Sequence, residues 1–415
     1  MPKTILVLIS IFFLSCSSRE TGGIAEHYTT LPNLTVIPAD IQPKYSVQFI
    51  REAIYGSSND IIIGPIGTIT VDESGRVYIS AEETIGILVF ETDGHYLAQI
   101  GRNGRGPGEF MHDFPAIHIS SNRLYAIDLV AHRINIFSLE SFQLIRTFNI
   151  NTDSEVPSLD NYYISHILSK NDGTFLAGYK RFLSEVPGLP DGTKIDTLSI
   201  HYYSLSERGN IGSDGILEIK QQPVVVGSFI GAKGPVSFNF FSKPLITISD
   251  AGTIYVTQSN NFLIKEYNKV GKYQRAFFHP FTKVELSREA VAENQRDFGQ
   301  KMITLRGSDQ DMVQMMMNNR LATLRKMDLP LDWPALNDLL VDDHNRLWVS
   351  TIVEIFDVYE WWVLENTGEL ITKFEWPRNE PIEVVKNGYI YTRETEEETG
   401  QQQVVRYRIA FDEVN

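Results

Sequence analysis

The hydrophobic pattern of the chain repeats along most of its length. Each copy has a turn containing Gly or Asn, followed by a short strand that includes a Tyr, Trp or Phe. Asp-Gly and Asn-Gly between β-rich runs are typical of hairpins, because such turns need residues that tolerate positive φ. The copies lie at residues 73–79, 121–126, 171–176, 250–256, 343–349 and 386–391.

Each turn belongs to a longer unit of four strands. An apolar strand precedes it, as at 66–71 and 245–248, and most copies are followed by a third strand, as at 133–137, and a fourth, as at 96–100. Units of four antiparallel strands about 45 residues apart are typical of propeller blades. A β-sandwich is the alternative, but it does not need the same unit six times. The pattern therefore predicts an all-β fold, a six-bladed β-propeller.

The last repeat supplies only three of its four strands, at 382–385, 389–392 and 404–409. Near the N-terminus, the alternating run 45–50 has no blade of its own. We expect this run to complete the last blade and close the ring, because closure removes an exposed sheet edge.

The longest connections are expected on one face of the ring. If the strands of a blade are named a to d from the axis outward, the a–b and c–d turns share one face, and the b–c and d–a connections share the other. The long b–c loops are 180–196 and 393–402, and the long d–a segments are 101–110, 206–243 and 279–335. Loops on one face of a rigid scaffold commonly form binding sites.

The segment from about 285 to 327 is different, because it is rich in helix formers and has no Pro. It predicts two helices, with Ser287 as N-cap, a break near Gly307-Ser308 and Pro330 ending the second helix. Apolar residues recur at roughly helical spacing: Met312, Val313, Met315, Met316, Leu321 and Leu324. We expect this face to pack on the propeller. A partner or ligand surface is the alternative, because methionine adapts to varied shapes.

Composition and charge narrow the possible partners. Hydrophobic residues make up 42% of the chain and charged residues 21%, as in a folded soluble protein. The net charge is −15 and no basic patch stands out, so nucleic acid is not an expected partner. The single cysteine, Cys16, excludes an internal disulfide and a zinc site of the Cys/His kind.

The first residues have the features of an export signal. Lys3 precedes an apolar run at 5–14, which is too short to span a bilayer but suits a signal peptide. Ser15-Cys16 follows and resembles a bacterial lipobox, although Phe13 stands where leucine is usual. The resemblance implies cleavage before Cys16 and lipid attachment to it. An ordinary secretory signal is the alternative.

These features divide the chain into three parts. Residues 1–15 are interpreted as a lipoprotein signal peptide, 16–35 as a flexible polar tether and 36–415 as the propeller with its helical insertion. The protein is then expected to be exported and anchored by lipid in the bacterial cell envelope, with the outer membrane as its location.

The segment 101–110 resembles the NHL-repeat family, and the likeness continues through 114–117, 124–128 and 133–137. Together with the lipobox, the chain looks like the NHL-like six-bladed propeller lipoproteins of the Bacteroidetes type. Most of that group has no assigned activity. The glycines of 101–110 do not form a dinucleotide fingerprint, because no helix follows to receive a pyrophosphate. They are expected to allow a tight crossing between blades.

The sequence carries no G-x-S-x-G elbow, no H-E-x-x-H pair and no D-x-[DN]-x-[DN]-G calcium loop. We therefore expect a non-catalytic module without a cofactor, which binds a protein, a peptide or a glycan. The b–c loops are the expected source of ligand contacts. Topology alone selects Glu82, Asp128, His132, Arg133, Arg181, Asn260, Glu354 and Asp357.

The sequence leaves other interpretations open. A calcium-assisted hydrolase or lyase would need oxygen ligands on the propeller axis, such as the Glu, Asn and Asp set of sugar-lactonase-type propellers, for which Glu82, Asn260 and Asp357 are candidates. A structural subunit of an envelope complex would dock through the helical insertion. Tyr359, Trp361 and Trp362 are expected to pack between blades, with a sugar-stacking platform as the alternative.

Overall fold

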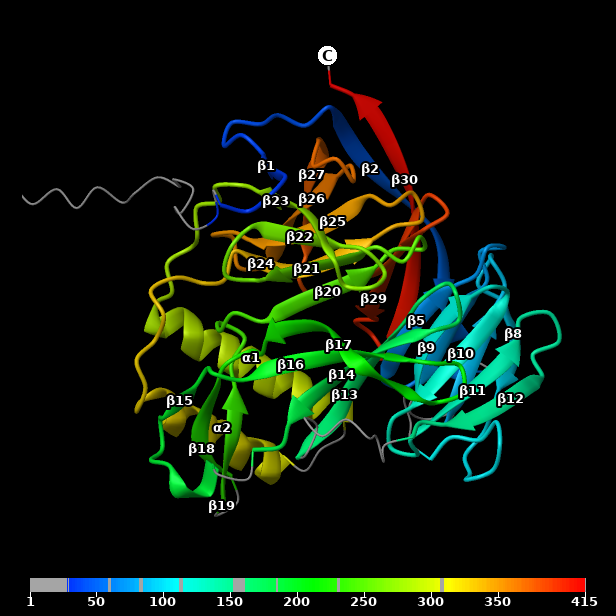
Figure 1. Cartoon of the computed structure of the whole chain (residues 1–415), viewed down its shortest axis with the longest axis horizontal. Helices are drawn as coiled ribbons and strands as arrows, with labels where there is room; N and C mark the ends of the chain where they lie inside the picture. The colour runs from blue at the N-terminus through cyan, green and yellow to red at the C-terminus, as the bar shows by residue number, and fades with distance from the viewer. Residues whose placement is uncertain are drawn as a thin grey trace, which may run out of the picture.

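The structure is a computed structural model that describes residues 28, 30–58, 61–81, 85–111, 115–151, 161–183, 186–229, 232–306 and 310–414. Within these ranges, six four-stranded antiparallel blades are arranged around a common axis (Figure 1). The predicted all-β, six-bladed propeller is confirmed.

The first three blades follow one another along the chain, and their strands run in sequence order from the axis outward. Blade 1 is β5 (Ile66–Val71), β6 (Val77–Ala81), β7 (Gly86–Phe90) and β8 (Tyr96–Ile100). Blade 2 is β9 (Ala116–Ser120), β10 (Arg123–Asp128), β11 (Arg133–Ser138) and β12 (Leu144–Asn149). Blade 3 is β13 (Tyr162–Ser169), β14 (Phe175–Arg181), β16 (Ser199–Leu205) and β17 (Ile211–Lys220).

The second half of the ring follows the same order, except that the outermost strand of blade 6 comes from the start of the chain. Blade 4 is β20 (Pro244–Ile248), β21 (Ile254–Gln258), β22 (Leu263–Tyr267) and β23 (Tyr273–Phe278). Blade 5 is β24 (Leu336–Val341), β25 (Leu347–Ile352), β26 (Val358–Leu364) and β27 (Leu370–Pro377). Blade 6 is β28 (Ile382–Lys386), β29 (Tyr389–Thr395), β30 (Gln402–Glu413) and β2 (Tyr45–Tyr55). A two-stranded hairpin, β3 (Ser57–Ser58) and β4 (Ile61–Ile62), precedes blade 1.

The ring closes as predicted. β2 pairs antiparallel with β30, from Tyr45 opposite Glu413 to Tyr55 opposite Val404. Tyr55 is fully buried at the end of this ladder, and its hydroxyl donates a hydrogen bond to the carbonyl of Thr92 in blade 1, at 3.0 Å. The N-terminal strand therefore joins the last blade to the first.

A buried carboxylate fixes the a–b turn of blade 5. Oδ1 of Asp342 accepts hydrogen bonds from the N–H groups of His344 and Arg346, at 3.0 and 2.8 Å. Oδ2 accepts from Nε of Arg346 at 2.7 Å and from the indole N–H of Trp348 at 3.0 Å. Asp72 holds the turn of blade 1 in the same way, with donors from Ser74, Arg76 and Tyr78. The repeated turn motif thus carries its own hydrogen-bond network.

The hydrophobic core lies between the blades. One cluster joins blades 4 and 5 and includes Phe262 and Trp362, whereas another joins blades 5 and 6 and includes Trp361 and Ile390. Both tryptophans are buried. Because neighbouring residues of a strand point to opposite faces, Trp361 and Trp362 fasten blade 5 to both of its neighbours. The interpretation of these aromatic residues as packing between blades is confirmed.

The long insertions assemble into one cap on the b–c face. The cap contains β15 (Lys194–Ile195), β18 (Val224–Phe229), β19 (Ala232–Ser237), α1 (Arg288–Arg306) and α2 (Gln310–Leu324). A 3₁₀ turn, η2 (Val186–Gly188), lies beside β19. β15 pairs with β18 across the two insertions, and α2 packs against β18 and α1 (Figure 1). Elaboration of a single face is therefore confirmed.

The stretch 206–243 differs from expectation. It is not simply a connection, because it contains β17 of blade 3 and two strands of the cap. Register shifts opposite Tyr203 interrupt the alternation of β17 and hide it in the sequence.

The helical insertion begins where the sequence predicted and ends earlier than predicted. The N-cap is confirmed, since Oγ of Ser287 accepts a hydrogen bond from the N–H of Ala290 at 3.0 Å. The second helix ends at Leu324, before Pro330. The predicted break near Gly307-Ser308 lies outside the described residues.

The start of the described chain forms a strap against blade 4. β1 (Leu34–Val36) pairs in parallel with β23, and the hydroxyl of Tyr28 accepts a hydrogen bond from Nδ2 of Asn261 at 2.6 Å. This part of the predicted tether is docked, because Leu31 and Leu34 pack on Phe278 and its neighbours. The predicted signal peptide and Cys16 lie outside the described residues.

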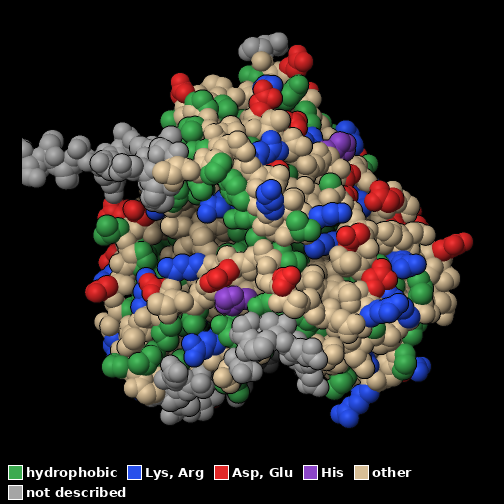
Figure 2. Space-filling model, viewed as in Figure 1, with side chains coloured by type: hydrophobic (Ala, Val, Ile, Leu, Met, Phe, Trp, Pro, Cys, Tyr) green, Lys and Arg blue, Asp and Glu red, His purple; other side chains and the backbone are tan. Residues whose placement is uncertain are grey.

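None of the helices that the structure describes is long and apolar enough to cross a bilayer. Acidic and basic side chains are interspersed over the face shown in Figure 2, without a single-sign patch. Charges of both signs are thus mixed on this face of the protein.

Candidate functional site

Several of the strands that line the axis are irregular at their cap-side ends. The pairing of these strands with their neighbours shifts register between Ile66 and Ile69 in β5, Ile164 and His166 in β13, Leu336 and Asp338 in β24, and Ile382 and Val384 in β28. The ladders of β9 and β20 are regular. Bulges change the direction of a side chain and are common beside functional sites. Here they place Ser165, Asn337 and Glu383 at the extra positions.

A cavity of about 420 Å³ lies beside these irregular strands, and we call it the channel pocket. It extends across blades 3, 4 and 5. Its polar lining is His166, Lys180, Tyr202, Gln222, Lys243 and Asp338. Its apolar lining is Leu168, Ile200, Pro244, Leu245, Ile246 and Leu339. An apolar cavity with a few convergent polar groups is the usual form of a ligand site.

His166 stands on the bulged part of β13. Its Nδ1 lies 2.8 Å from Oγ of Ser165, and its Nε2 lies 3.0 Å from the hydroxyl of Tyr202. Burial lowers the pKa of His166 to about 4, and the charge of Lys180 acts in the same direction. The imidazole is therefore neutral at pH 7, and its two nitrogens hold it in place against Ser165 and Tyr202.

Replacing His166 with Asn should make the stability less sensitive to acid. The folded protein holds this imidazole neutral to a pKa of about 4, whereas the unfolded chain protonates near pH 6.5. The unfolded state thus binds more protons between these values, and the unfolding free energy falls as pH falls through that window. From pH 7 to pH 5, wild type should lose about 2 kcal/mol more than His166→Asn in urea unfolding.

The control for this measurement is His132→Asn, because His132 is exposed and has a positive φ of 48° that Asn tolerates. It makes the same change of residue at an exposed site, and its unfolding free energy is measured at the same pH values. Equal losses in wild type and His166→Asn would show that His166 titrates normally in the folded protein.

Charged groups of both signs meet at the channel pocket. Burial lowers the pKa of Lys180. Burial raises the pKa of Asp338, against the opposing charge of Lys243. Burial also raises the pKa of the nearby Glu383, although Nη2 of Arg393 lies 2.8 Å from its Oε1. Shifted pKa values in a cavity are typical of functional sites.

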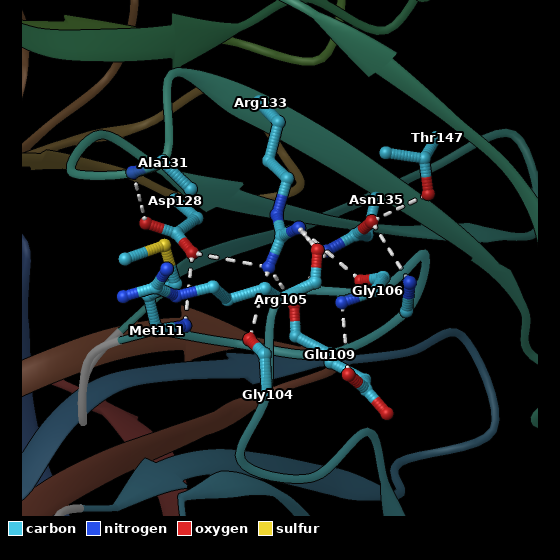
Figure 3. Close-up of polar contacts among 11 residues, drawn as sticks. Gly104, Arg105, Gly106, Glu109, Met111, Asp128, Ala131, Arg133, Asn135 and Thr147 are labelled. Carbon is cyan, nitrogen blue, oxygen red and sulfur yellow. Dashed lines mark hydrogen bonds and ion pairs between the residues drawn. The ribbon is translucent and has the colours of Figure 1, made fainter.

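Two of the residues expected to contact a ligand instead hold the glycine-rich loop 101–110. Arg133 donates hydrogen bonds to the carbonyls of Arg105 at 2.8 Å and Gly106 at 3.2 Å, and also to that of Glu109 (Figure 3). Asp128 pairs with Arg133 at 3.7 Å. Both side chains are buried and already engaged by protein groups. Their position beside the loop gives them a structural role.

The loop needs glycine at particular points. Gly104 has φ of +154°, and a Cβ there would lie 2.0 Å from Oε2 of Glu109. That carboxylate accepts a hydrogen bond from the N–H of Gly106 at 2.8 Å (Figure 3). The expectation that these glycines allow a tight crossing between blades 1 and 2 agrees with this geometry.

The other predicted residues are dispersed. Asn260 lines two surface grooves between blades 3 and 4 and the cap. His132, Arg181, Glu354 and Asp357 are exposed on b–c loops or strand ends. Glu82 lies outside the described residues. Among the described residues, none of the predicted set lines the channel pocket.

The proposed axial set for calcium is likewise not assembled in the described part of the chain, since Asn260 lines grooves and Asp357 is exposed. The channel carboxylates are Asp338 and Glu383 instead. Among described residues, the one group of three ligand-type side chains close enough to share an ion is Asp342, Asp343 and His344. In this group, Oδ2 of Asp342 already accepts hydrogen bonds from the side chains of Arg346 and Trp348.

Sequence reasoning missed the channel pocket because its residues come from three blades. Some lie on innermost strands and others on the second and third strands or in the connections between blades. A bulge interrupts the alternation of inward- and outward-facing side chains along a strand. In β24 the sequence shows this interruption as Leu336-Asn337-Asp338-Leu339, where two polar residues stand within an apolar strand. Glu383 next to Ile382 in β28 is a similar signal. Charged residues in innermost strands would have been better candidates than loop residues.

Comparison with known proteins agrees with this architecture. Residues 56–181 match the family model DUF5128, described as a 6-bladed beta-propeller. A structure of a DUF4221 family member from Bacteroides vulgatus is similar to the chain, with a TM-score of 0.51 and 10% identity, over 89% of this chain and 100% of that chain. No curated protein sequence matches.

Two further structures are similar at lower TM-scores. A Bacteroides fragilis protein described as a candidate exported protein has 12% identity and a TM-score of 0.48, over 91% of this chain and 100% of that chain. A PQQ-bound aldose sugar dehydrogenase from Streptomyces coelicolor has 10% identity and a TM-score of 0.43, over 89% of this chain and 99% of that chain. At such identities, likeness shows the fold alone. The chain is a six-bladed β-propeller with a cap over one face.

Proposed function

We propose that this chain is an exported binding module of the cell envelope, anchored by lipid on Cys16, that takes its ligand into the channel pocket from the cap face. The observation that supports the binding site is the convergence of Lys180, Lys243, Asp338 and His166 on one cavity beside bulged strands. The signal-like residues 1–16 and the resemblance to NHL-like lipoproteins support export and anchoring.

The size of the cavity limits what it can enclose. A volume of about 420 Å³ suits a small molecule, or one end of a peptide or glycan chain. The cap lies on the same side of the ring and lines a second cavity of about 430 Å³, with Lys194, Phe241, Lys283 and Trp333 among its residues. A larger ligand that enters the channel pocket would therefore also touch the cap.

Filling the channel pocket should abolish ligand binding. Ile246 lines the pocket, and Ile246→Trp would occupy part of its volume. In a thermal-shift screen of sugars, sugar acids, peptides and organic acids, we expect hits with wild type that disappear in Ile246→Trp. The control is Tyr96→Trp, since Tyr96 is an exposed residue on β8. Hits that persist in Ile246→Trp, or a screen without any pocket-dependent hit, would contradict the proposal.

A second function, calcium-assisted hydrolysis or elimination, is favoured by the two channel carboxylates Asp338 and Glu383. Each comes from the cap-side end of an innermost strand. Calcium prefers such oxygen ligands. Stabilisation of wild type by calcium that is lost in Asp338→Asn would favour this function over simple binding.

A further inference from the structure

Within the described chain, the two lysines of the channel pocket make no contact ion pair. Among the described residues, neither Lys180 nor Lys243 makes an ion pair or a hydrogen bond through its ammonium group. Other lysines of the protein do form such pairs, as Lys326 does with Asp191 at 2.9 Å. Among the described residues, Lys272 also has no ion pair but is exposed to solvent, whereas Lys180 and Lys243 are partly buried and share one cavity.

Partial burial makes these charges costly to leave unneutralised. Lys180 and Lys243 are both only partly exposed, and the apolar residues Leu168, Ile200 and Ile246 share the cavity with them. An ammonium group loses hydration in such surroundings, and an anion that enters the cavity restores part of the lost interaction. The cavity walls also concentrate the field of the lysines toward its interior.

The acidic groups nearby do not cancel the lysines. Asp338 is the one carboxylate among the described residues that line the pocket, and Lys243 acts on it without forming a contact ion pair. Glu383 is committed to Arg393 at 2.8 Å. The lining therefore has an excess of positive charge on the side of blades 3 and 4, with a carboxyl group on the side of blade 5.

The neutral groups add a second requirement. Gln222 is fixed because its Nε2 donates a hydrogen bond to the carbonyl of Phe238 at 2.9 Å. Its side-chain oxygen is thus left to accept from a ligand, as is Oδ2 of Asp338, since Oδ1 already accepts from the N–H of Leu339 at 3.2 Å. A ligand that uses both ends of the pocket would carry an anionic group together with hydroxyl or amino groups.

Resting on the proposed function, we infer that the channel pocket binds a small organic anion that also bears hydroxyl or amino groups. Lys180 and Lys243 are its counter-ions, and Gln222 and Asp338 accept its hydrogen bonds. Lysine neutralises charge as a point cation and does not require planar bidentate geometry, so a carboxylate and a phosphate are both suitable. Probes that carry one or the other distinguish these two anions.

The test is isothermal titration at constant ionic strength with three probes: D-glucuronate, D-glucose 6-phosphate and D-glucose. We expect saturable binding of one or both anions, at least about tenfold tighter than that of glucose, since only the anions can pair with the lysines. Lys180→Met and Lys243→Met should each weaken the anion about tenfold or more and leave glucose unchanged. The anion that binds more tightly shows whether the pocket prefers a carboxylate or a phosphate group.

Matched controls separate this inference from the proposed function. Lys272→Met removes an exposed lysine on the c–d turn of blade 4 and should leave anion binding unchanged. Anion binding that survives both pocket substitutions, or no saturable anion binding at all, would overturn the inference. A neutral ligand whose binding Ile246→Trp abolishes would overturn the anion inference while leaving the channel pocket as the binding site.

Discussion

A chain that begins at Ser57, and so lacks β1 and β2, is expected to lose cooperative unfolding. Without β2, the twelve-residue strand β30 has an open edge, and the contact of Tyr55 with blade 1 is lost. An open edge on a sheet is also prone to aggregation. The loss should exceed the roughly 5–15 kcal/mol that stabilises an ordinary domain, so urea or thermal unfolding should show no sharp transition.

A chain that begins at Tyr28 is the control, because it keeps every described strand. Adding a synthetic peptide of residues 43–58 to the shorter chain should restore a cooperative transition. A peptide of the same composition in scrambled order should not, since register fixes which face of the strand is buried. A chain from Ser57 that melts like the control would show that β2 does not hold the ring closed.

Arg133→Met should lower the unfolding free energy by about 4 kcal/mol and release the glycine-rich loop. The guanidinium of Arg133 is almost fully buried and serves the carbonyls of Arg105, Gly106 and Glu109. Methionine fills a similar volume but removes the hydrogen bonds to these carbonyls and the positive charge beside Asp128. Urea unfolding measures the stability, and amide exchange in residues 101–110 should accelerate.

The matched control is Arg123→Met, in the same blade at the other end of β10. Arg123 makes no side-chain hydrogen bond or ion pair in the described part of the chain, so its loss should change stability by less than about 0.5 kcal/mol. If Arg133→Met and Arg123→Met lose equal stability, the loop is held by its glycines and not by the arginine.

The fold was accessible from sequence because each blade repeats the same local signals. The turn at 343–349 shows why, since Asp342, Arg346 and Trp348 hold one another within a single hairpin. Closure by β2 was also predictable, because a repeat short of one strand and an extra strand elsewhere complete each other. Both inferences depend on local patterning and on the need to pair strand edges.

The candidate site was not accessible in the same way. The channel pocket depends on where His166, Gln222 and Asp338 meet across three blades, and no spacing in the sequence encodes that distance. Asp128 and Arg133 were selected because they flank a b–c loop. In the structure, Arg133 instead binds the glycine-rich loop 101–110 between blades 1 and 2, and Asp128 pairs with Arg133. Tertiary packing determines whether a polar side chain faces a ligand cavity or hydrogen-bonds to the backbone.

The N-terminal strap has a mechanical consequence. Before the chain reaches β2 it is fastened to blade 4 through β1, then through the bond from Ile37 to Phe278, and to blade 5 through the bond from Lys44 to Ile371. Tension applied from the N-terminal end must break these short attachments one after another before it loads the long β2–β30 ladder. Under such a force the short attachments of the strap would separate first, and the closing strand β2 would bear the load last.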